Sequence, residues 1–402
     1  MLGRKGLVVK PRPVVSTPIF AHEPRATASL ASTRLRVVEL DLLRFLAALA
    51  VVLYHFTYHL RDSETAVDLF PSIGRVGMHG YLGVNLFFMI SGFVILWTAR
   101  DRTPSGFVLS RITRLYPEFW IGVLLSSIAF SFHPVTVGRT ITAPQVLANL
   151  TMVPAFLGQD YVDDVYWTLF VELKFYALLW GLSVTRQMKR VEVWLFAWLI
   201  VTIACFTLPV PNALKSLALY PYGPLFIGGS LFYLIRAEGA TPARFVGAAV
   251  CGLVAMTQVT LQMSNFVQPQ DVSTATQWES RILIFLFFAT FAVIALRRSA
   301  AVPFAAAIAF LGALTYPLYL VHNIGRVMVL RPLATHEKYV ALVVAVAFSL
   351  LLAAMIARLV DGRVRRPFAR WLERMLLTVS RSASSSRDWI GRTRARIPSE
   401  LP

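Results

Sequence analysis

The residue pair with the clearest chemical potential lies in one apolar stretch, residues 38–59. Arg44 and His55 are eleven residues apart in it. In an α-helix this spacing is about 20° more than three full turns, so both side chains lie on one face, about 16 Å apart along the axis. An arginine can hold a phosphate or carboxylate through its planar fork of donors, and a histidine can accept a proton near neutral pH. The pair therefore suits a reaction on a substrate that carries an anionic group.

Two other interpretations of this stretch are open. Arg44 could reach the membrane interface beside Asp41, three residues earlier, while His55 bonds to another helix. His55 and His59 are four residues apart and could bind a metal ion on one helical turn. No third ligand accompanies them in the stretch, and the sequence contains no HExxH pattern, so we predict no metal site.

A second basic pair, Arg111 and Arg114, lies at the start of another apolar stretch. Residues three apart share a helix face, so the two guanidinium groups could hold phosphates together. They could equally be the basic residues that flank a membrane span. Glu118 follows in the same segment and could pair with one of them.

Two further ionisable residues lie within or at the end of apolar stretches. Glu172 lies in the middle of one, where it could orient the histidine, bind a hydroxyl or neutralise a buried arginine. Lys174, two residues later, does not share its helix face. His322 ends a later stretch, a position where a histidine is more often interfacial than catalytic.

The composition places these residues in a membrane protein. The 402 residues are 56% hydrophobic and 15% charged, whereas soluble globular proteins carry about 25% charged residues. This excludes a soluble enzyme, a disordered chain, a fibrous repeat and a disulfide scaffold. Cys205 and Cys251 both lie in apolar stretches, which indicates buried packing residues.

Ten apolar stretches approach the ~20 residues that cross ~30 Å of hydrocarbon. We therefore predict an all-α, polytopic integral-membrane bundle of about ten transmembrane helices. The stretches are residues 38–59, 80–99, 115–132, 161–183, 191–210, 217–235, 245–262, 279–296, 301–322 and 339–357. A shorter stretch, 145–157, contains Pro154 and could be re-entrant or interfacial.

The positive charge predicts the orientation of the bundle. The net charge is +18, of which residues 1–36 contribute +6 and residues 358–402 contribute +7. One set of alternate loops carries 11 Lys/Arg in 34 residues, and the other set carries at most seven in 91. The positive-inside rule then places both termini in the cytosol. Basic flanks that touch anionic lipid explain the charge better than nucleic-acid binding does.

We predict three segments along the chain. Residues 1–36 form a flexible basic arm, because they lack the apolar core of a signal peptide and contain three prolines before residue 19. Residues 37–359 form the transmembrane domain. Residues 360–402 form a basic cytosolic tail, in which the apolar residues between 367 and 377 recur at the spacing of a helix that lies on a lipid surface.

Five motifs in order along residues 38–323 resemble those of the membrane acyltransferase-3 family. The family's first-span pattern, an arginine followed after ten residues by a histidine, is present as Arg44 and His55. The other four are GVNLFFMISGFVI, RITRLYP with Arg111 and Arg114, YWTLFVELKFY with Glu172, and TYPLYLVH ending at His322. Each motif is weak alone, but five in family order are strongly specific.

The chain differs from the family pattern near its end. The family's core often closes with a Glu-Arg-Pro element, whereas this chain reads DGRVRRP, which weakens any assignment of an acid near the last span. Many members carry an esterase-like domain after the bundle, and we expect none here.

The resemblance implies a bacterial enzyme of the cytoplasmic (inner) membrane. Such an enzyme moves an acyl group, commonly acetyl, from acyl-CoA to a hydroxyl of a glycan, a lipid-linked sugar or a small metabolite, with no cofactor besides the donor. The implied roles are His55 as general base, Glu172 as its support or as an acceptor-positioning residue, Arg44, Arg111 and Arg114 as donor-binding residues, and Asp41 and His322 as accessory residues.

Two rival functions remain open at this point. A transporter or flippase for a glycan or lipid also carries buried charge in a helical bundle. Consumption of acyl-CoA by membranes that hold the protein would separate the two functions. A family member without activity could be a binding or regulatory subunit, against which the intact Arg44, His55 and Glu172 argue.

Overall fold

The computed structural model describes residues 37–59, 69–133, 138, 140–297, 303–333 and 337–376. These residues form helices and connecting loops, and none of them forms a strand, so the all-α class is confirmed. The chain divides into two units, Met1–Val37 and Val38–Pro402, and the fold below is that of the second. The predicted arm 1–36 and the tail beyond residue 376 lie outside the described residues.

Ten long helices follow the ten apolar stretches within this part of the chain. They are α2 (Val38–Leu53), α4 (Leu82–Arg100), α5 (Pro104–Ser131), α8 (Trp167–Val184), α9 (Val191–Thr207), α11 (Gly223–Glu238), α12 (Pro242–Phe266), α13 (Thr274–Leu296), α14 (Ala305–Gly325) and α16 (Lys338–Leu359). Four short helices, α3 (Pro71–Gly77), α7 (Ala143–Asn149), α10 (Asn212–Leu217) and α15 (Arg331–Leu333), lie in the connections.

Eight described helical segments are long and apolar enough to cross a membrane. The other two long helices miss that standard because α11 has only 16 residues and α5 carries Arg111, Arg114 and Glu118. A membrane-spanning helical bundle is therefore confirmed, and the total of ten spans and the cytosolic termini stay predictions. The stretch 145–157 forms the seven-residue α7 and a 3₁₀ turn at Pro154–Leu157, both too short to span.

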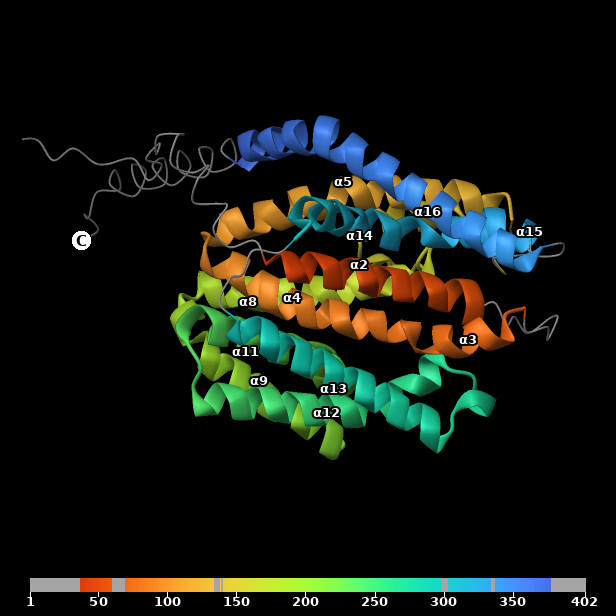
Figure 1. The fold of residues 1–402 in the computed structure, drawn as a ribbon. Helices are drawn as coiled ribbons and strands as arrows, with labels where there is room; N and C mark the ends of the chain where they lie inside the picture. The colour runs from red at the N-terminus through yellow and green to blue at the C-terminus, as the bar shows by residue number, and fades with distance from the viewer. Residues whose placement is uncertain are drawn as a thin grey trace, which may run out of the picture. The chain divides into compact units, whose positions relative to one another are not determined.

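The helices pack in an order that leaves α2 inside the bundle. Contacts run from α16 to α14, then to α2, α4, α11, α12 and α13 (Figure 1). Two glycines of α4 permit its close contacts. A Cβ at Gly83 would lie 2.4 Å from the carbonyl oxygen of Ala47 in α2, and one at Gly92 would lie 2.2 Å from that of Phe226 in α11. Both distances are too short for any side chain larger than hydrogen.

The last described helix is longer than its apolar stretch. After a π-helical turn at Val360–Val364 the chain stays helical to Leu376, so the residues predicted as an amphipathic helix continue α16 (Figure 1). Phe368 contacts Trp120 of α5 with ring centroids 5.6 Å apart, and Trp371 stacks on Phe368. This extension is therefore held against α5, and its place on a lipid surface stays a prediction.

Candidate active site

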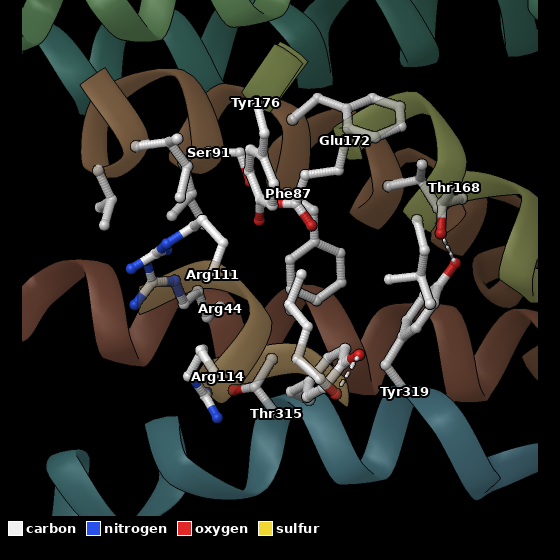
Figure 2. A pocket seen from close by; sticks show the side chains of 18 of the residues that line it. Arg44, Phe87, Ser91, Arg111, Arg114, Thr168, Glu172, Tyr176, Thr315 and Tyr319 are labelled. Atoms are coloured by element: carbon white, nitrogen blue, oxygen red, sulfur yellow. Dashed lines mark hydrogen bonds between the residues drawn. The ribbon is translucent and has the colours of Figure 1, made fainter. Parts of the chain in front are cut away.

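A cavity of about 270 Å³ lies among α2, α4, α5, α8 and α14. Its lining combines apolar side chains with a larger share of polar ones than is usual for a ligand site. Figure 2 shows the arginines on one side of this cavity and the Thr168–Tyr319 pair on the other. The polar lining residues are Arg44, Ser91, Arg111, Arg114, Thr168, Glu172, Tyr176, Thr315, Tyr316 and Tyr319.

The basic end of the cavity joins two helices. Arg44 comes from α2, whereas Arg111 and Arg114 come from one face of α5, as their spacing predicted. Arg44 interacts electrostatically with both of the others and with Glu172. Its Nη1 lies 3.3 Å from Oδ1 of Asp41, so the predicted neighbour is present. Three guanidinium groups around one cavity make a site for a polyanion.

Glu118 forms an ion pair with Arg114 and does not itself line the cavity. Its carboxylate is 1% exposed and accepts hydrogen bonds from Arg114 at 3.3 Å and from Arg365 at 2.6 Å. Arg365 belongs to the stretch DGRVRRP that departs from the family pattern. In this protein that stretch supplies a cation, Arg365, and the acid that pairs with it is Glu118 of α5. The two cations compensate a carboxylate that would be costly to bury alone.

Glu172 lies inside the cavity near the arginines. Its Oε1 accepts a hydrogen bond from Ser91 of α4 at 2.5 Å, and Tyr176 interacts with both Glu172 and Arg111. Ser91 belongs to the motif GVNLFFMISGFVI, but nothing in its spacing singled it out. α8 packs against α4 and α5, so Glu172 lies with the residues of those helices.

The cavity closes at its other end on two aromatic rings. The Tyr319 hydroxyl lies 2.8 Å from Oγ1 of Thr168 and donates to the carbonyl oxygen of Val165 at 3.0 Å. The Phe87 ring meets the Tyr319 ring edge-on, with centroids 5.7 Å apart. Tyr319 precedes His322 by three residues in α14, and the cavity lining includes Tyr319 but not His322.

His55 and His322 form a pair beyond Tyr319. Nδ1 of His55 lies 2.9 Å from the carbonyl oxygen of Val51 and 3.2 Å from Nε2 of His322. A carbonyl only accepts hydrogen bonds, so Nδ1 of His55 carries the hydrogen and Nε2 is left as the basic nitrogen. Nδ1 of His322 likewise donates to the carbonyl of Tyr319 at 2.9 Å, which leaves its Nε2 to accept from His55.

One of the roles that the sequence left open for Glu172 was to orient the histidine. In the structure His55 hydrogen-bonds to His322, because α14 packs along α2. The side chain of His322 is fully buried within the bundle. The signal that could have found the pair was weak, a second histidine at the end of another apolar stretch.

Two local features of this region were not predictable from residue types. His55 lies in a π-helical turn, Tyr54–Tyr58, and a second π-helical turn, Arg326–Leu330, begins just after α14. The two turns contact each other. Such turns are rare and often mark functional sites.

His59 lies close to His55. The two rings meet edge-on with centroids 5.5 Å apart. Across the described ranges, no group of three or more His, Cys, Asp or Glu side chains is placed to hold a metal ion.

Curated proteins are similar to this chain over part of its length. The exopolysaccharide production protein ExoZ of Rhizobium meliloti (strain 1021) is 30% identical over 194 residues, which are 45% of this chain and 60% of that protein. The acyltransferase MdmB of Streptomyces mycarofaciens is 28% identical over 188 residues, 44% of this chain and 46% of that protein. Nodulation protein 10 of Rhizobium leguminosarum bv. viciae is 27% identical over 172 residues, 37% of this chain and 45% of that protein.

The matches thus span 45–60% of the length of these relatives. No solved structure matches the chain. The family described as "Acyltransferase domain" matches residues 37–359, which include α2 to α16 and every side chain of the cavity and the histidine pair. The chain is therefore a multi-pass membrane protein that belongs to the acyltransferase family defined by this domain.

Proposed function

We propose that the protein is an integral-membrane O-acyltransferase. It moves an acyl group, acetyl in the first instance, from acyl-CoA to a hydroxyl of a glycan or a lipid-linked sugar. The observation that supports this most is the combination of a cavity lined by three arginines with a histidine pair on two of the helical segments that line it.

The arginine end suits the phosphates of CoA. Arg44, Arg111 and Arg114 present permanent positive charge, and guanidinium groups bind phosphate through paired hydrogen bonds. At about 270 Å³ the cavity is at the small end for an organic ligand. We therefore place the nucleotide part of acyl-CoA at the mouth of the cavity. Only the narrow arm of acyl-CoA that ends in the thioester enters the cavity.

The length of the site fits this placement. Arg44 and His55 belong to one continuous helical segment, Val38–Tyr58, and lie about 16 Å apart along it. The arm follows this direction, past Ser91 and Glu172, towards the rings of Phe87 and Tyr319. A change of rotamer at these rings would bring the thioester to the histidine pair.

At the histidine pair the chemistry is a direct transfer. The acceptor oxygen attacks the thioester carbonyl carbon, and Nε2 of His55 takes the hydroxyl proton. The carbon–sulfur bond breaks, and the same proton passes to the departing CoA sulfur. The positive charge that His55 holds in between is stabilised by the Nδ1–H hydrogen bond to His322, with 3.2 Å between the nitrogens.

The acceptor class is supported by one relative. ExoZ is named as an exopolysaccharide production protein. We propose a related acceptor here, a sugar unit of a surface polysaccharide or its lipid-linked precursor. We place the protein in the cytoplasmic membrane of a bacterium with the arginine end facing the cytosol, where acyl-CoA is made and where the positive-inside rule places the basic loops.

The test compares the O-acyl content of surface glycans and lipids in three strains, by proton NMR and mass spectrometry. One strain lacks the gene, one has it restored, and one carries the His55→Ala variant at equal membrane abundance. We expect O-acyl groups to return only with the intact gene. Equal restoration by the variant would reject His55 as the base and favour a transporter or flippase.

A further inference from the structure

A group of buried polar side chains lies next to the histidine pair, and the mechanism above does not use it. Asn323 follows His322 directly in α14, and its amide nitrogen donates to Oδ1 of Asp163 at 2.8 Å. Asp163 precedes the turn that starts α8, and its Oδ1 also accepts from the backbone of Val165 at 3.2 Å. The group thus ties the start of α8 to the end of α14.

Two oxygens of this group have no hydrogen-bond partner among the residues that the structure describes. They are Oδ2 of Asp163 and Oδ1 of Asn323, on side chains that are 2% and 3% exposed. More than nine in ten buried polar groups in proteins are paired. Leaving such a group unpaired costs about 1–3 kcal/mol. Two unpaired oxygens on hydrogen-bonded neighbours therefore indicate that something else completes their bonding.

Both oxygens are acceptors, so the missing partner must be a donor. A carboxylate oxygen and an amide oxygen side by side can accept from two neighbouring hydroxyl groups. They are less suited to a phosphate or a carboxylate, which would bring a second acceptor to the same place. A positive charge also acts on this group, because Arg326 interacts electrostatically with Asp163, His55 and His322.

The position of the group relates it to the transfer. Arg326 begins the second π-helical turn, which contacts the π-helical turn that holds His55. His322 hydrogen-bonds to His55 and adjoins Asn323 in sequence. A molecule held by Asn323 and Asp163 would therefore lie close to the base.

We propose that Asp163 and Asn323 form the acceptor subsite of this protein and bind two hydroxyl groups of a sugar ring while a third hydroxyl meets His55. This inference rests on the proposed function and specifies its acceptor as a polyhydroxylated ring. It predicts selectivity, because a site built to pair with a hydroxyl strongly rejects an analogue that lacks it.

The experiment uses the full chain in lipid nanodiscs with acetyl-CoA as donor. The acceptor probes are hexyl glycosides of glucose, galactose and mannose and their single-deoxy analogues, and release of CoA thiol and the acetylated product are both measured. Asn323→Ala and Asp163→Asn are the test variants. Gln258→Leu is the matched control, since Gln258 of α12 is also fully buried with both amide atoms unpartnered.

We expect the wild type and Gln258→Leu to prefer one parent glycoside over a deoxy analogue by about tenfold or more, which corresponds to a single lost hydrogen bond in a buried site. Asn323→Ala and Asp163→Asn should lose this preference while the KM for acetyl-CoA stays unchanged. A preference kept by both test variants, with only kcat reduced, would show that the pair merely supports the fold and would overturn the subsite.

Glycoside binding without acetyl-CoA, measured by calorimetry on the same nanodiscs, tests the subsite apart from the reaction. Preferential binding by the wild type that both test variants lose supports the subsite, even if no acetyl-CoA is consumed and the proposed function itself fails. If the wild type binds no parent glycoside better than its deoxy analogue, the unpaired oxygens serve water and the inference is wrong.

Discussion

The arginine end of the cavity and the histidine pair differ in how they are built. Arg111 and Arg114 come from one helix at the spacing of one turn, and Arg44 completes the set from the adjacent end of α2. His55 and His322 come from helices separated by 267 residues and meet only through the contact of α2 with α14.

Their surroundings differ as well. Arg44 lies beside Asp41 and Arg114 beside Glu118, and the side chains of these two arginines are 29% and 38% exposed. His322 is fully buried and hydrogen-bonds to the backbone carbonyl of Tyr319 and to His55. These surroundings fit the proposal that the arginines attract a charged ligand and that the pair is shielded for proton transfer. Substitutions at the two ends should therefore alter different kinetic constants.

The largest effect is expected at the base. His55→Gln removes Nε2 as a proton acceptor, and general-base catalysis contributes about 10²–10⁴-fold. We expect kcat to fall by that factor while the dissociation constant for acyl-CoA stays within twofold. Stopped-flow thiol release and calorimetry on the nanodisc protein measure the two quantities. Weakened donor binding in this variant would place His55 at the donor end instead.

The next effect is expected at its partner. His322→Leu removes one of the two acceptors that share the His55 Nδ1–H, the other being the Val51 carbonyl. Hydrogen bonds to charged groups contribute about 1.5–3 kcal/mol, or roughly 10–150-fold. We expect kcat to fall within that range. His322→Gln can still offer an oxygen to the same hydrogen and should recover part of the loss. Equal rates for the Leu and Gln variants would mean that the pair does not share the charge.

At the arginine end the effect should appear in KM. Arg111→Gln removes one phosphate contact, so we expect the KM for acyl-CoA to rise about tenfold, with kcat within a factor of two. Arg102→Gln is the control, because Arg102 is exposed, lies in the same predicted cytosolic loop and is outside the cavity lining. A similar rise in KM for the Arg102→Gln variant would mean that Arg111 acts only through general surface charge and not by contact with a phosphate.

The smallest effect is expected between the two ends. Tyr319→Phe keeps the ring that closes the cavity and removes the hydrogen bonds to Thr168 and Val165. Two neutral hydrogen bonds contribute about 2 kcal/mol together, so we expect the melting temperature to fall by a few degrees. The rate should fall less than tenfold. Thermal unfolding and initial rates check both statements, and a loss as large as that of His55→Gln would make the hydroxyl itself part of the chemistry.

Much of the fold could be predicted because it depends on local properties. Each apolar stretch became a long helix, since hydropathy over about 20 residues decides which segments leave water. A helix boundary differed from the predicted one where packing against another helix outweighed local hydropathy. The helix that starts at Lys338 continues to Leu376, because Phe368 packs on Trp120 of α5 and Trp371 stacks on Phe368.

The candidate site was predicted in parts. The arginines were identified from their spacing, and the five motifs led to the family that the match over residues 37–359 then confirmed. Ser91, Asp163 and Asn323 were missed, because a serine, an acid at a helix start and an amide in an apolar stretch are common and carry no spacing signal. The neighbours of Glu172 could not be predicted, because they belong to α4 and α5, which pack against α8.

The sequence by itself determined that this protein spans a membrane, which segments are helical and which residues carry charge into the bundle. Those properties follow from side-chain hydropathy and from the 3.6-residue turn, and both act within a single helix. Only the tertiary structure decided which of those groups meet. The His55–His322 pair, the Ser91–Glu172 hydrogen bond and the unpaired oxygens of Asp163 and Asn323 in the described structure depend on the order in which helices pack. That order is set by the shapes of whole helix faces, among them the contact points at Gly83 and Gly92.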